Sequence, residues 1–423
     1  MTFAAKDEYM KFDAFQIADG IKNSISRLGF KRPTDIQYKA IPPILRGEDV
    51  LAIAQTGTGK TAAFSIPVLH ILQERKIRGR PDGVKCLVMV PTHELALQTE
   101  NVFRVLGKHT RINAFAIHGG VDQDPQIAQL NKGVDVLIAT PGRMFDLVSQ
   151  GALNLKRVEI LVLDEADHML DLGFIKDIRD LMRYLPGKRQ TLFFSATIDE
   201  KIKKIAYSLV TNPIRIQISP KDPVARNIDH AVAFIEMDDK RFFLEQLITG
   251  HPERKILVFV RTKVRAERVQ KAMERVGIQA DTIHGDKEQV QRQLTMQRFH
   301  RGELKVMIAT DVSARGIDIP DVEIVVNYDL PETPEFYIHR VGRTGRGNSP
   351  GVAVSFCSKE EKQLLSKIEA QLPKPIHRME ISSGLYRETV ESSQAHEEND
   401  WKSLLEQETS FRNSHKKKKK HTS

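Results

Sequence analysis

The chain has 423 residues, a length that fits two or three domains and excludes a mini-protein stapled by disulfides. Apolar residues make up 40% and charged residues 28%, so most of the chain can bury hydrophobic cores. No apolar run approaches the roughly 18–20 residues of a membrane span, and charges interrupt the N-terminus too early for a secretory signal. Cys86 and Cys357 lie in apolar runs and are expected to be small core residues.

The net charge is +9, and the lysine run at residues 416–420 contributes five of the positive charges. The body of the chain is therefore only mildly basic. A basic excess fits a polyanionic partner such as nucleic acid, but charge alone is weak evidence for one.

Short apolar runs alternate with longer amphipathic segments through most of the chain. The runs are rich in β-branched residues, which is typical of strands buried on both faces of a parallel sheet. Helix-length segments between them predict βαβ units and an α/β fold. The expected strands are residues 49–54, 85–90, 135–139, 159–163 and 191–194, followed by 231–235, 255–260, 305–309, 323–327 and 351–356.

Residues 117–140 and 283–310 form a weak internal repeat. Both begin with Ile-His-Gly and end in Ile-Ala-Thr, and the two endings lie 170 residues apart. The repeat predicts two similar α/β domains in tandem, with chance similarity between βαβ units as the alternative. The expected organisation is an N-terminal domain over residues 1–217, a linker over 218–226, a second domain over 227–372 and a flexible tail over 373–423. Helical spacing around Trp401 indicates a short docking helix or a segment that frays.

A phosphate-binding loop is predicted where a strand meets an apolar helix at AQTGTGKT, residues 54–61. The string fits the pattern GxxxxGK[ST] except for its first residue. Glycines let backbone N–H groups cradle phosphate oxygens, the lysine neutralises phosphate charge, and the threonine hydroxyl ligates Mg²⁺. A plain glycine-rich turn is the alternative. The nucleotide contacts expected here are Ala54, Gln55, Thr56, Gly57, Thr58, Gly59, Lys60 and Thr61.

The acidic partner of this loop is predicted at the end of the apolar run 159–163. Asp164 would hold Mg²⁺, partly through water, because ligands bind at the carboxyl ends of parallel strands. Glu165 would orient or deprotonate an attacking water, as phosphoryl transfer to water requires. The alternative is a solvated helix cap.

Basic residues concentrate in HRVGRTGR, residues 339–346. Arg343 and Arg346 are three residues apart and would share one face of a helix. They are candidates for arginine fingers that stabilise charge on the γ-phosphate. A basic surface patch is the alternative.

Taken together, these strings resemble the DEAD-box ATP-dependent RNA helicases. AQTGTGKT, PTHELA, TPGR, DEAD, SAT, ATDVSARGID and HRVGRTGR follow the order of that family, and GFKRPTDIQ at residues 29–37 resembles its adenine-reading Q motif. The resemblance covers about residues 10 to 372. DDKRFFLEQLI and VFVRTK are similar to the bacterial RhlE-like subgroup. The family implies two RecA-like parallel-sheet domains and use of ATP and Mg²⁺, and the subgroup resemblance implies a bacterial cytoplasmic location.

The resemblance also implies roles for residues outside the phosphate loop. Lys31 and Gln37 of the Q motif and the upstream Phe12 would contact the adenine, and Gly316 and Asp318 would contact the nucleotide from the second domain. The residues that would couple hydrolysis to strand separation are Asp167, Ser195, Thr197 and His339. Those that would bind RNA phosphates and sugars are Thr92, Gly119, Gly120, Thr140, Arg143, Arg261, Thr262, Arg292 and Thr310.

One position departs from the family pattern. The family's PTRELA is PTHELA here, so His93 replaces an arginine. A forked, always charged donor becomes a residue that titrates near neutral pH, which would weaken one RNA or inter-motif contact.

The expected activity is RNA-stimulated ATP hydrolysis that drives domain closure and local, non-processive unwinding of short RNA duplexes. A nucleotide-gated RNA clamp and a DNA-stimulated helicase share the same motifs and remain alternatives; a P-loop kinase would not need the second domain's arginines. RNA is the expected partner, with possible ribonucleoprotein partners, and a monomer is assumed. The run 416–420 is interpreted as a nonspecific RNA anchor or as a solvated tail.

Overall fold

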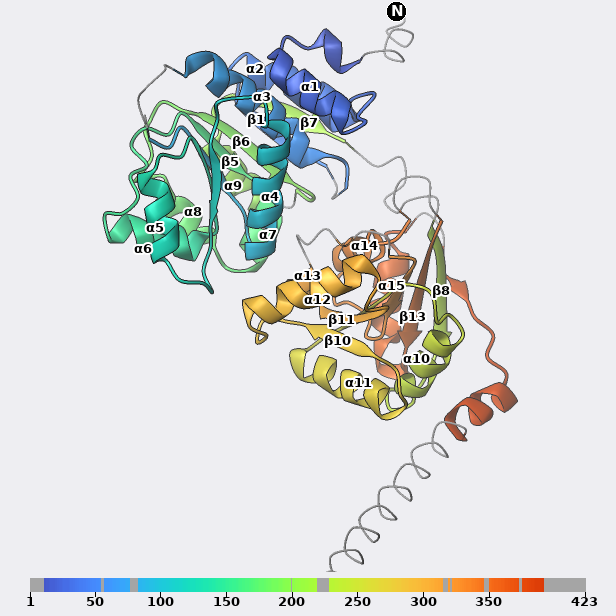
Figure 1. The fold of residues 1–423 in the computed structure, drawn as a ribbon. Helices are drawn as coiled ribbons and strands as arrows, with labels where there is room; N and C mark the ends of the chain where they lie inside the picture. The colour runs from blue at the N-terminus through green and yellow to red at the C-terminus, as the bar shows by residue number, and fades with distance from the viewer. Residues whose placement is uncertain are drawn as a thin grey trace, which may run out of the picture. The chain divides into compact units, whose positions relative to one another are not determined.

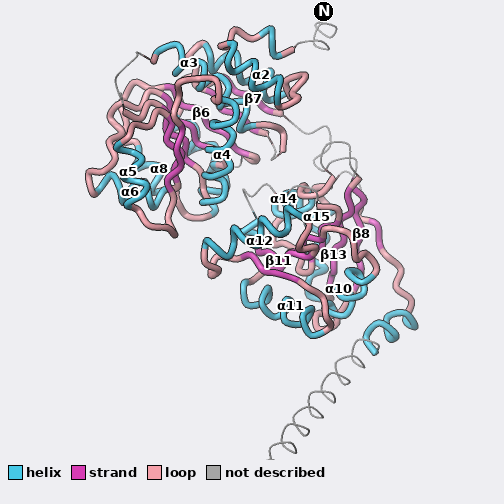
Figure 2. Tube along the Cα trace, in the orientation of Figure 1, coloured by secondary structure: helices cyan, strands magenta, loops and turns pink. Residues whose placement is uncertain are grey.

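The computed structural model describes residues 11–54, 57–76, 83–198, 200–218, 228–314, 319, 322–345, 350–372 and 375–391. The chain divides into two compact units, and each is built around its own seven-stranded sheet (Figure 1). Figure 2 shows the strands of each unit flanked by helices. No helix in the described residues is long and apolar enough to cross a membrane.

The sheet of the first unit is entirely parallel. Its strand order is β3-β4-β2-β5-β6-β1-β7, so the strand before the phosphate loop, β1, lies between β6 and β7. The strands are β1 (Val50–Ile53), β2 (Cys86–Met89), β3 (Ala114–Ile117), β4 (Val136–Ala139), β5 (Ile160–Leu163), β6 (Gln190–Ser195) and β7 (Ile214–Gln217).

Alternate residues of these strands face two separate hydrophobic cores. Val50 and Ala52 of β1 belong to one core, and Leu51 and Ile53 belong to the other. Burial of both faces explains why the strand sequences are apolar without alternation. The helices of this unit are η2 (Phe12–Ala14), α1 (Asp19–Arg27), α2 (Asp35–Leu45), α3 (Lys60–Arg75), α4 (His93–Leu106), α5 (Asp124–Asn131), α6 (Pro141–Ser149), α7 (Ala166–Asp171), α8 (Ile175–Leu181) and α9 (Glu200–Leu209).

The second unit repeats this topology. Its parallel sheet has the order β10-β11-β9-β12-β13-β8-β14, which matches the first sheet position by position. The strands that end in Ile-Ala-Thr, β4 and β11, are each second from one edge, so the sequence repeat reflects a repeated fold. The strands are β8 (Ile228–Phe234), β9 (Ile256–Val260), β10 (Ala280–Ile283), β11 (Val306–Thr310), β12 (Ile324–Asn327), β13 (Gly351–Cys357) and β14 (His377–Arg378).

Helices of the second unit also pack on two cores. Phe243, Val258 and Val269 belong to one core, and Val232, Tyr337 and Leu365 belong to the other. Cys86 and Cys357 are buried and unpaired, which confirms that they are core residues. The helices are α10 (Lys240–Thr249), α11 (Lys263–Arg275), α12 (Gln289–Arg301), α13 (Asp311–Ala314), α14 (Pro334–Val341), η3 (Lys359–Glu361) and α15 (Lys362–Glu369).

All ten predicted strands are present, with ends shifted by a few residues, but four strands were missed. The missed strands are β3, β7, β10 and β14, and each is an edge strand of its sheet. Edge strands expose one side or are short, so their sequences lack the continuous apolar pattern. Arg215 and Gln217 of β7 are exposed, for example, and β14 has only two residues.

The prediction of a flexible tail from residue 373 is wrong for residues 375–391. His377 and Arg378 pair with β8, and residues 383–391 are helical. The Tyr386 hydroxyl donates to Asp239 Oδ2 at 2.7 Å and accepts the Glu236 N–H at 3.1 Å. Its ring lies 4.9 Å from that of Phe243. The sequence pattern missed this segment because its apolar residues are few and pack on another element. Trp401, the lysine run and residues 219–227 of the predicted linker region lie outside the described residues.

Replacement of Tyr386 should loosen the segment from the second domain. Tyr386→Ala removes both hydrogen bonds and the ring contact, so it should cost about 2 kcal/mol of local stability. In hydrogen exchange, the amides of residues 383–391 should then exchange roughly thirtyfold faster. Leu385→Ala is the matched control because Leu385 is 43% exposed. Equal protection in Tyr386→Ala and the wild type would contradict the packing role.

Candidate active site

Most of the predicted motif strings follow the carboxyl ends of the strands. In the first unit, the loops after β1, β2, β4, β5 and β6 carry the strings AQTGTGKT, PTHELA, TPGR, DEAD and SAT. In the second unit, the loops after β9 and β11 carry VFVRTK and ATDVSARGID. Since all strands are parallel, each set of loops lies along one edge of its own sheet, where ligands of open α/β sheets bind.

The phosphate loop turns through glycines and ends at a buried lysine. Gly57 and Gly59 have φ values of +80° and +90°, which only glycine adopts readily. Lys60 begins α3, is 6% exposed, and its Nζ donates to the Ala54 carbonyl at 2.9 Å. The loop therefore holds an ammonium at the N-terminus of a helix, a setting that suits phosphate. Gln55 and Thr56 lie outside the described residues.

Gln37 ties the Q-motif segment to the phosphate loop. Its Oε1 accepts the Thr34 N–H at 3.0 Å, and its Nε2 donates to the Gly59 carbonyl at 3.2 Å. A Cβ at Gly59 would lie 2.5 Å from Gln37 Nε2, so a larger residue there would displace the Gln37 amide from this hydrogen bond. Phe12 is buried edge-on against Phe15. Lys31 is exposed.

Asp164 is a strongly desolvated carboxyl at the end of β5. It is 2% exposed, and burial raises its pKa to about 7 although Lys60 opposes the shift. Its Oδ1 accepts the Glu165 N–H at 3.0 Å. Glu165 has φ +51° and ψ +48°, a left-handed conformation that is uncommon for glutamate. Such strained backbone occurs preferentially where a site requires one side-chain direction.

The DEAD and SAT strings are joined by hydrogen bonds within the first unit. Asp167 Oδ2 accepts both the backbone N–H and the hydroxyl of Thr197 at 3.1 Å. The Ser195 hydroxyl donates to the Thr197 carbonyl at 2.7 Å. A movement of the Asp167 carboxylate on α7 can therefore be transmitted to the loop after β6 through these hydrogen bonds.

The predicted RNA contacts of the first unit lie at helix starts and tight turns. Thr92 is the N-cap of α4 and accepts the Leu95 N–H at 3.3 Å, whereas Thr140 is the N-cap of α6 and is buried. Gly120 has φ +75°. The Arg143 guanidinium donates to the Val121 carbonyl at 2.8 Å.

His93 lies against the loop that carries Gly119 and Gly120. Its ring is 5.1 Å from the ring of His118, at an angle of 31°. A Cβ at Gly119 would be 3.5 Å from His93 Nε2. The imidazole thus occupies part of the surface assigned to RNA, which places the departure from the family pattern within that surface.

In the second unit, the predicted arginine finger sits on α14 and its C-terminal turn. Arg343 is 4% exposed, and its Nε donates to the His339 carbonyl at 3.3 Å. Sequence reasoning passed over Arg340, which is buried and forms a bidentate pair with Asp311 at 2.6 and 2.7 Å. The one sequence feature that could have indicated Arg340 is its position within the string HRVGRTGR. Gly316, Asp318 and Arg346 lie outside the described residues.

The second set of predicted RNA contacts follows the same pattern as the first. Thr262 is the N-cap of α11 and accepts the Arg265 N–H at 3.2 Å, and the Thr310 hydroxyl pairs with that of Ser313 at 2.9 Å. Arg261 is 39% exposed in its side chain, and Arg292 lies in the first turn of α12. Hydroxyls, backbone N–H groups and guanidiniums of this kind suit phosphates and sugars.

Mg²⁺ fits the chemistry at Asp164. A buried carboxylate held near a cationic loop gains most from a divalent cation, and the Thr61 hydroxyl lies in the first turn of α3. Within the described residues no group of three His, Cys, Asp or Glu side chains is arranged to hold a metal. Water and phosphate oxygens would complete the coordination, as is usual for Mg²⁺.

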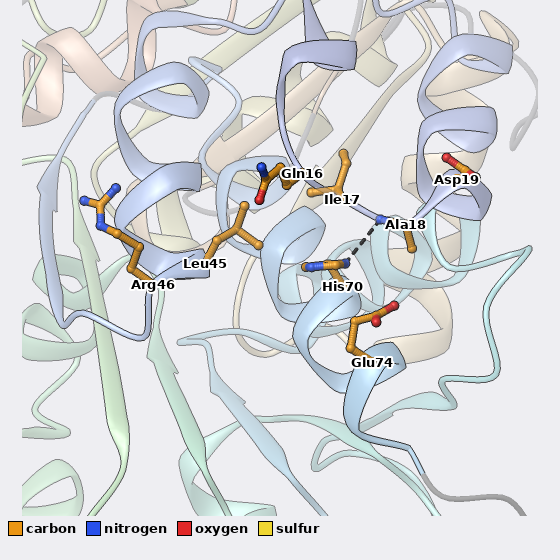
Figure 3. Close-up of a pocket in the computed structure, with 8 residues that line it drawn as sticks. All are labelled: Gln16, Ile17, Ala18, Asp19, Leu45, Arg46, His70 and Glu74. Carbon is orange, nitrogen blue, oxygen red and sulfur yellow. Dashed lines mark hydrogen bonds between the residues drawn. The ribbon is translucent and has the colours of Figure 1, made fainter.

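A separate cavity of about 650 Å³ opens between α1, α2 and α3 (Figure 3). The Ala18 N–H donates to His70 Nδ1 at 3.2 Å at its wall. None of its lining residues is a predicted site residue. They are Gln16, Ile17, Ala18, Asp19, Leu45, Arg46, His70 and Glu74.

Two family models match the chain. The DEAD/DEAH box helicase model matches residues 34–205, and the helicase conserved C-terminal domain model matches residues 239–348. The ATP-dependent RNA helicase CshA of Listeria monocytogenes is 39% identical over 359 residues, which cover 85% of this chain and 68% of the relative. The CshA of Geobacillus kaustophilus is 38% identical over 370 residues, covering 87% and 78%.

Solved structures with bound RNA are also similar. S. cerevisiae Dbp5 bound to RNA and ADP BeF3 has a TM-score of 0.78 and 31% identity, over 92% of this chain and 100% of the other. Mss116p bound to single-stranded RNA and AMP-PNP has a TM-score of 0.81 and 27% identity, over 96% of this chain and 87% of the other.

Asp164→Asn should stabilise the unliganded protein at high pH. The raised pKa means that the folded state holds a proton between pH 3.8 and about 7 that the unfolded state has lost, so the stabilisation disappears as pH rises through 7. Between pH 5.5 and pH 8 the variant should gain roughly 2 kcal/mol relative to wild type, or several degrees in the first domain's melting temperature.

The measurement is thermal unfolding of wild type and variant at pH 5.5 and pH 8. The quantity compared is the difference in melting temperature between the two proteins at each pH. Asn keeps an oxygen for the Glu165 N–H, so that hydrogen bond is retained. The exposed Asp146 provides the control variant Asp146→Asn. A variant less stable than wild type at pH 8 would show that the ionised carboxylate is net stabilising.

Proposed function

This chain belongs to the DEAD-box family of ATP-dependent RNA helicases, and we propose that it couples ATP hydrolysis to local unwinding of short RNA duplexes. In this proposal ATP and RNA jointly favour a closed arrangement of the two domains that accepts only a bent single strand. A short duplex then loses pairing locally, and hydrolysis reopens the protein. ATP can shift this equilibrium only by its preference for the closed state.

The nucleotide is assigned to the loop after β1. Residues 54–61 would bind the phosphates with Lys60 as the cationic partner, and Gln37, Lys31 and Phe12 would contact the base. The hydrogen bond from Gln37 to Gly59 supports this assignment, because it would make the loop respond to the adenine. Gly316 and Asp318 would complete the site from the second domain.

The chemical step is assigned to residues on both domains. Glu165 would orient the attacking water, and its left-handed backbone supports the role because it fixes the direction of the side chain. Asp164 and Thr61 would hold Mg²⁺, which when bound neutralises phosphate charge. Arg343 and Arg346 would stabilise charge that develops on the γ-phosphate.

RNA binding is assigned to the helix starts and arginines at the carboxyl edges of both sheets. These groups suit the sugar–phosphate backbone rather than bases, so we propose little sequence preference from the core. Asp167, Ser195, Thr197 and His339 would carry the signal between hydrolysis and RNA. The hydrogen bonds from Thr197 to Asp167 support the part of this path that lies in the first domain.

The subgroup, the location, the oligomeric state and the protein partners remain predictions. Two short strings of this chain are similar to the RhlE-like subgroup, whereas the relatives described above are named CshA. We propose a cytoplasmic monomer, with ribonucleoprotein partners as the setting in which it acts.

The single observation that carries the proposal is the pairing of a buried Lys60 with a desolvated Asp164 and a strained Glu165. Its test is ATP turnover with and without single-stranded RNA. Wild type should be strongly stimulated by RNA, and Glu165→Gln should lose at least a hundredfold of that rate because the base is gone. Glu74→Gln, on α3, is the control. Turnover that ignores RNA or is driven by DNA would contradict the proposal.

The same preparation separates unwinding from clamping. A helicase should separate a short duplex and release RNA soon after hydrolysis. Slow RNA release after ATP binding, with little strand separation, would favour the clamp.

His93→Arg should tighten binding of single-stranded RNA at pH 8 by about three- to tenfold, since it restores a permanent charge beside Gly119. Fluorescence anisotropy with a labelled oligonucleotide measures the affinity. His251→Arg adds the same charge at an exposed position and is the control. An unchanged affinity at pH 8 would contradict the idea that His93 weakens this contact.

A further inference from the structure

The second domain contains a buried ion pair that no motif of the nucleotide or RNA sites includes. Lys240 is the first residue of α10 and is fully buried, and Glu361 at the end of η3 is 2% exposed. Lys240 Nζ donates to Glu361 Oε2 at 2.5 Å and to the Tyr328 carbonyl at 2.8 Å. Glu361 lies beyond the residues that either family model matches.

Both oxygens of Glu361 are used by groups from separate elements. Oε2 accepts the Ser358 N–H at 3.1 Å as well as the Lys240 ammonium. Oε1 accepts the Leu330 N–H at 3.1 Å and the Arg261 Nη2 at 3.2 Å. The carboxylate thus joins the loop after β12 to the loop after β9.

These contacts fix one edge of the Arg261 guanidinium. Nη2 also donates to the Leu330 carbonyl at 3.3 Å, and the backbone N–H of Arg261 donates to Asp329 Oδ2 at 2.9 Å. The side chain is nevertheless 39% exposed, whereas the side chains of Asp329 and Glu361 are almost fully buried. The guanidinium is held through Nη2 by buried groups, while the side chain as a whole remains partly exposed.

We propose that Glu361 is a positioning residue for RNA binding, which holds the Arg261 guanidinium in the orientation that receives an RNA phosphate. The proposal rests on the proposed function, which assigns Arg261 to RNA. A free arginine side chain loses rotamer entropy when it is immobilised. A carboxylate that immobilises it before RNA arrives removes much of that cost from binding.

Lys240 has a separate task in this arrangement. An isolated buried carboxylate is strongly disfavoured, and the Lys240 ammonium is the buried cation paired with Glu361. Because Lys240 is buried, it pairs with Glu361 from inside the domain. The partly exposed Arg261 then remains available to an external anion. The pKa of Lys240 is lowered by burial, and the Glu361 carboxylate opposes that shift.

Two effects of removing Glu361 have opposite signs, which makes the proposal testable. By charge alone, loss of a carboxylate beside Arg261 should strengthen RNA binding. Loss of positioning should weaken it. Weaker binding in Glu361→Gln is therefore a result that a charge effect does not produce.

The test is a double-mutant cycle on RNA affinity in the full-length protein. Single-stranded oligouridylate is titrated by fluorescence anisotropy in the presence of AMP-PNP, with Glu361→Gln, Arg261→Gln and the double variant. We expect Arg261→Gln to weaken binding about tenfold and to flatten the salt dependence by about one phosphate contact. Glu361→Gln should weaken binding about three- to tenfold, and the double variant should match Arg261→Gln.

Misfolding is controlled by neutralising the pair. Glu361→Gln leaves Lys240 buried without its partner, so Lys240→Met/Glu361→Gln is made as well. It should bind RNA as weakly as Glu361→Gln, and Lys359→Ala, an exposed neighbour in η3, should bind like wild type.

Three results would overturn the proposal. The first is unchanged or tighter RNA binding in Glu361→Gln. The second is additive losses in the double variant, and the third is wild-type affinity in Lys240→Met/Glu361→Gln. If RNA stimulates ATP turnover but Arg261→Gln binds RNA like wild type, the positioning proposal falls while the helicase function stands.

Discussion

The loop to which the nucleotide is assigned depends on the parallel pairing of β1 between β6 and β7. This pairing buries all four residues of β1, so the chain leaves the sheet at a fixed point and turns through Gly57 and Gly59 into α3. A register error of one residue would exchange the two faces of β1 and expose Leu51 or Ala52 to the wrong core. The position of the Lys60 ammonium therefore follows from packing several residues away from it.

Two residues at the end of β5 have features that are unfavourable in themselves. Asp164 is an acid whose ionised form is disfavoured by burial, and Glu165 has a backbone conformation that glutamate rarely adopts. Neither feature stabilises the unliganded domain. Both are expected where a protein retains strain or desolvation because bound phosphate and cation restore the balance.

The two domains share one topology but place an equivalent lysine in different surroundings. β1 and β8 occupy equivalent positions, and each is followed by a helix that begins with a buried lysine, Lys60 or Lys240. Lys60 meets a backbone carbonyl at the phosphate loop, whereas Lys240 is neutralised by Glu361 from the same domain. The equivalent lysine thus contacts a loop carbonyl in one domain and forms an internal ion pair in the other, where the Arg261 side chain remains partly exposed.

The sequence by itself determined the α/β class, the central strands, the tandem repeat and the strings at the carboxyl edges, because burial on both faces and glycine-dependent turns leave local patterns. Only the tertiary structure decided the four edge strands, the docking of residues 375–391 and the contacts among distant side chains. Tyr386 with Asp239, Gln37 with Gly59, and Glu361 with Arg261 are separated by 147, 22 and 100 residues. Such pairs leave no periodic pattern in the sequence, because the order in which the strands pack brings the two residues together.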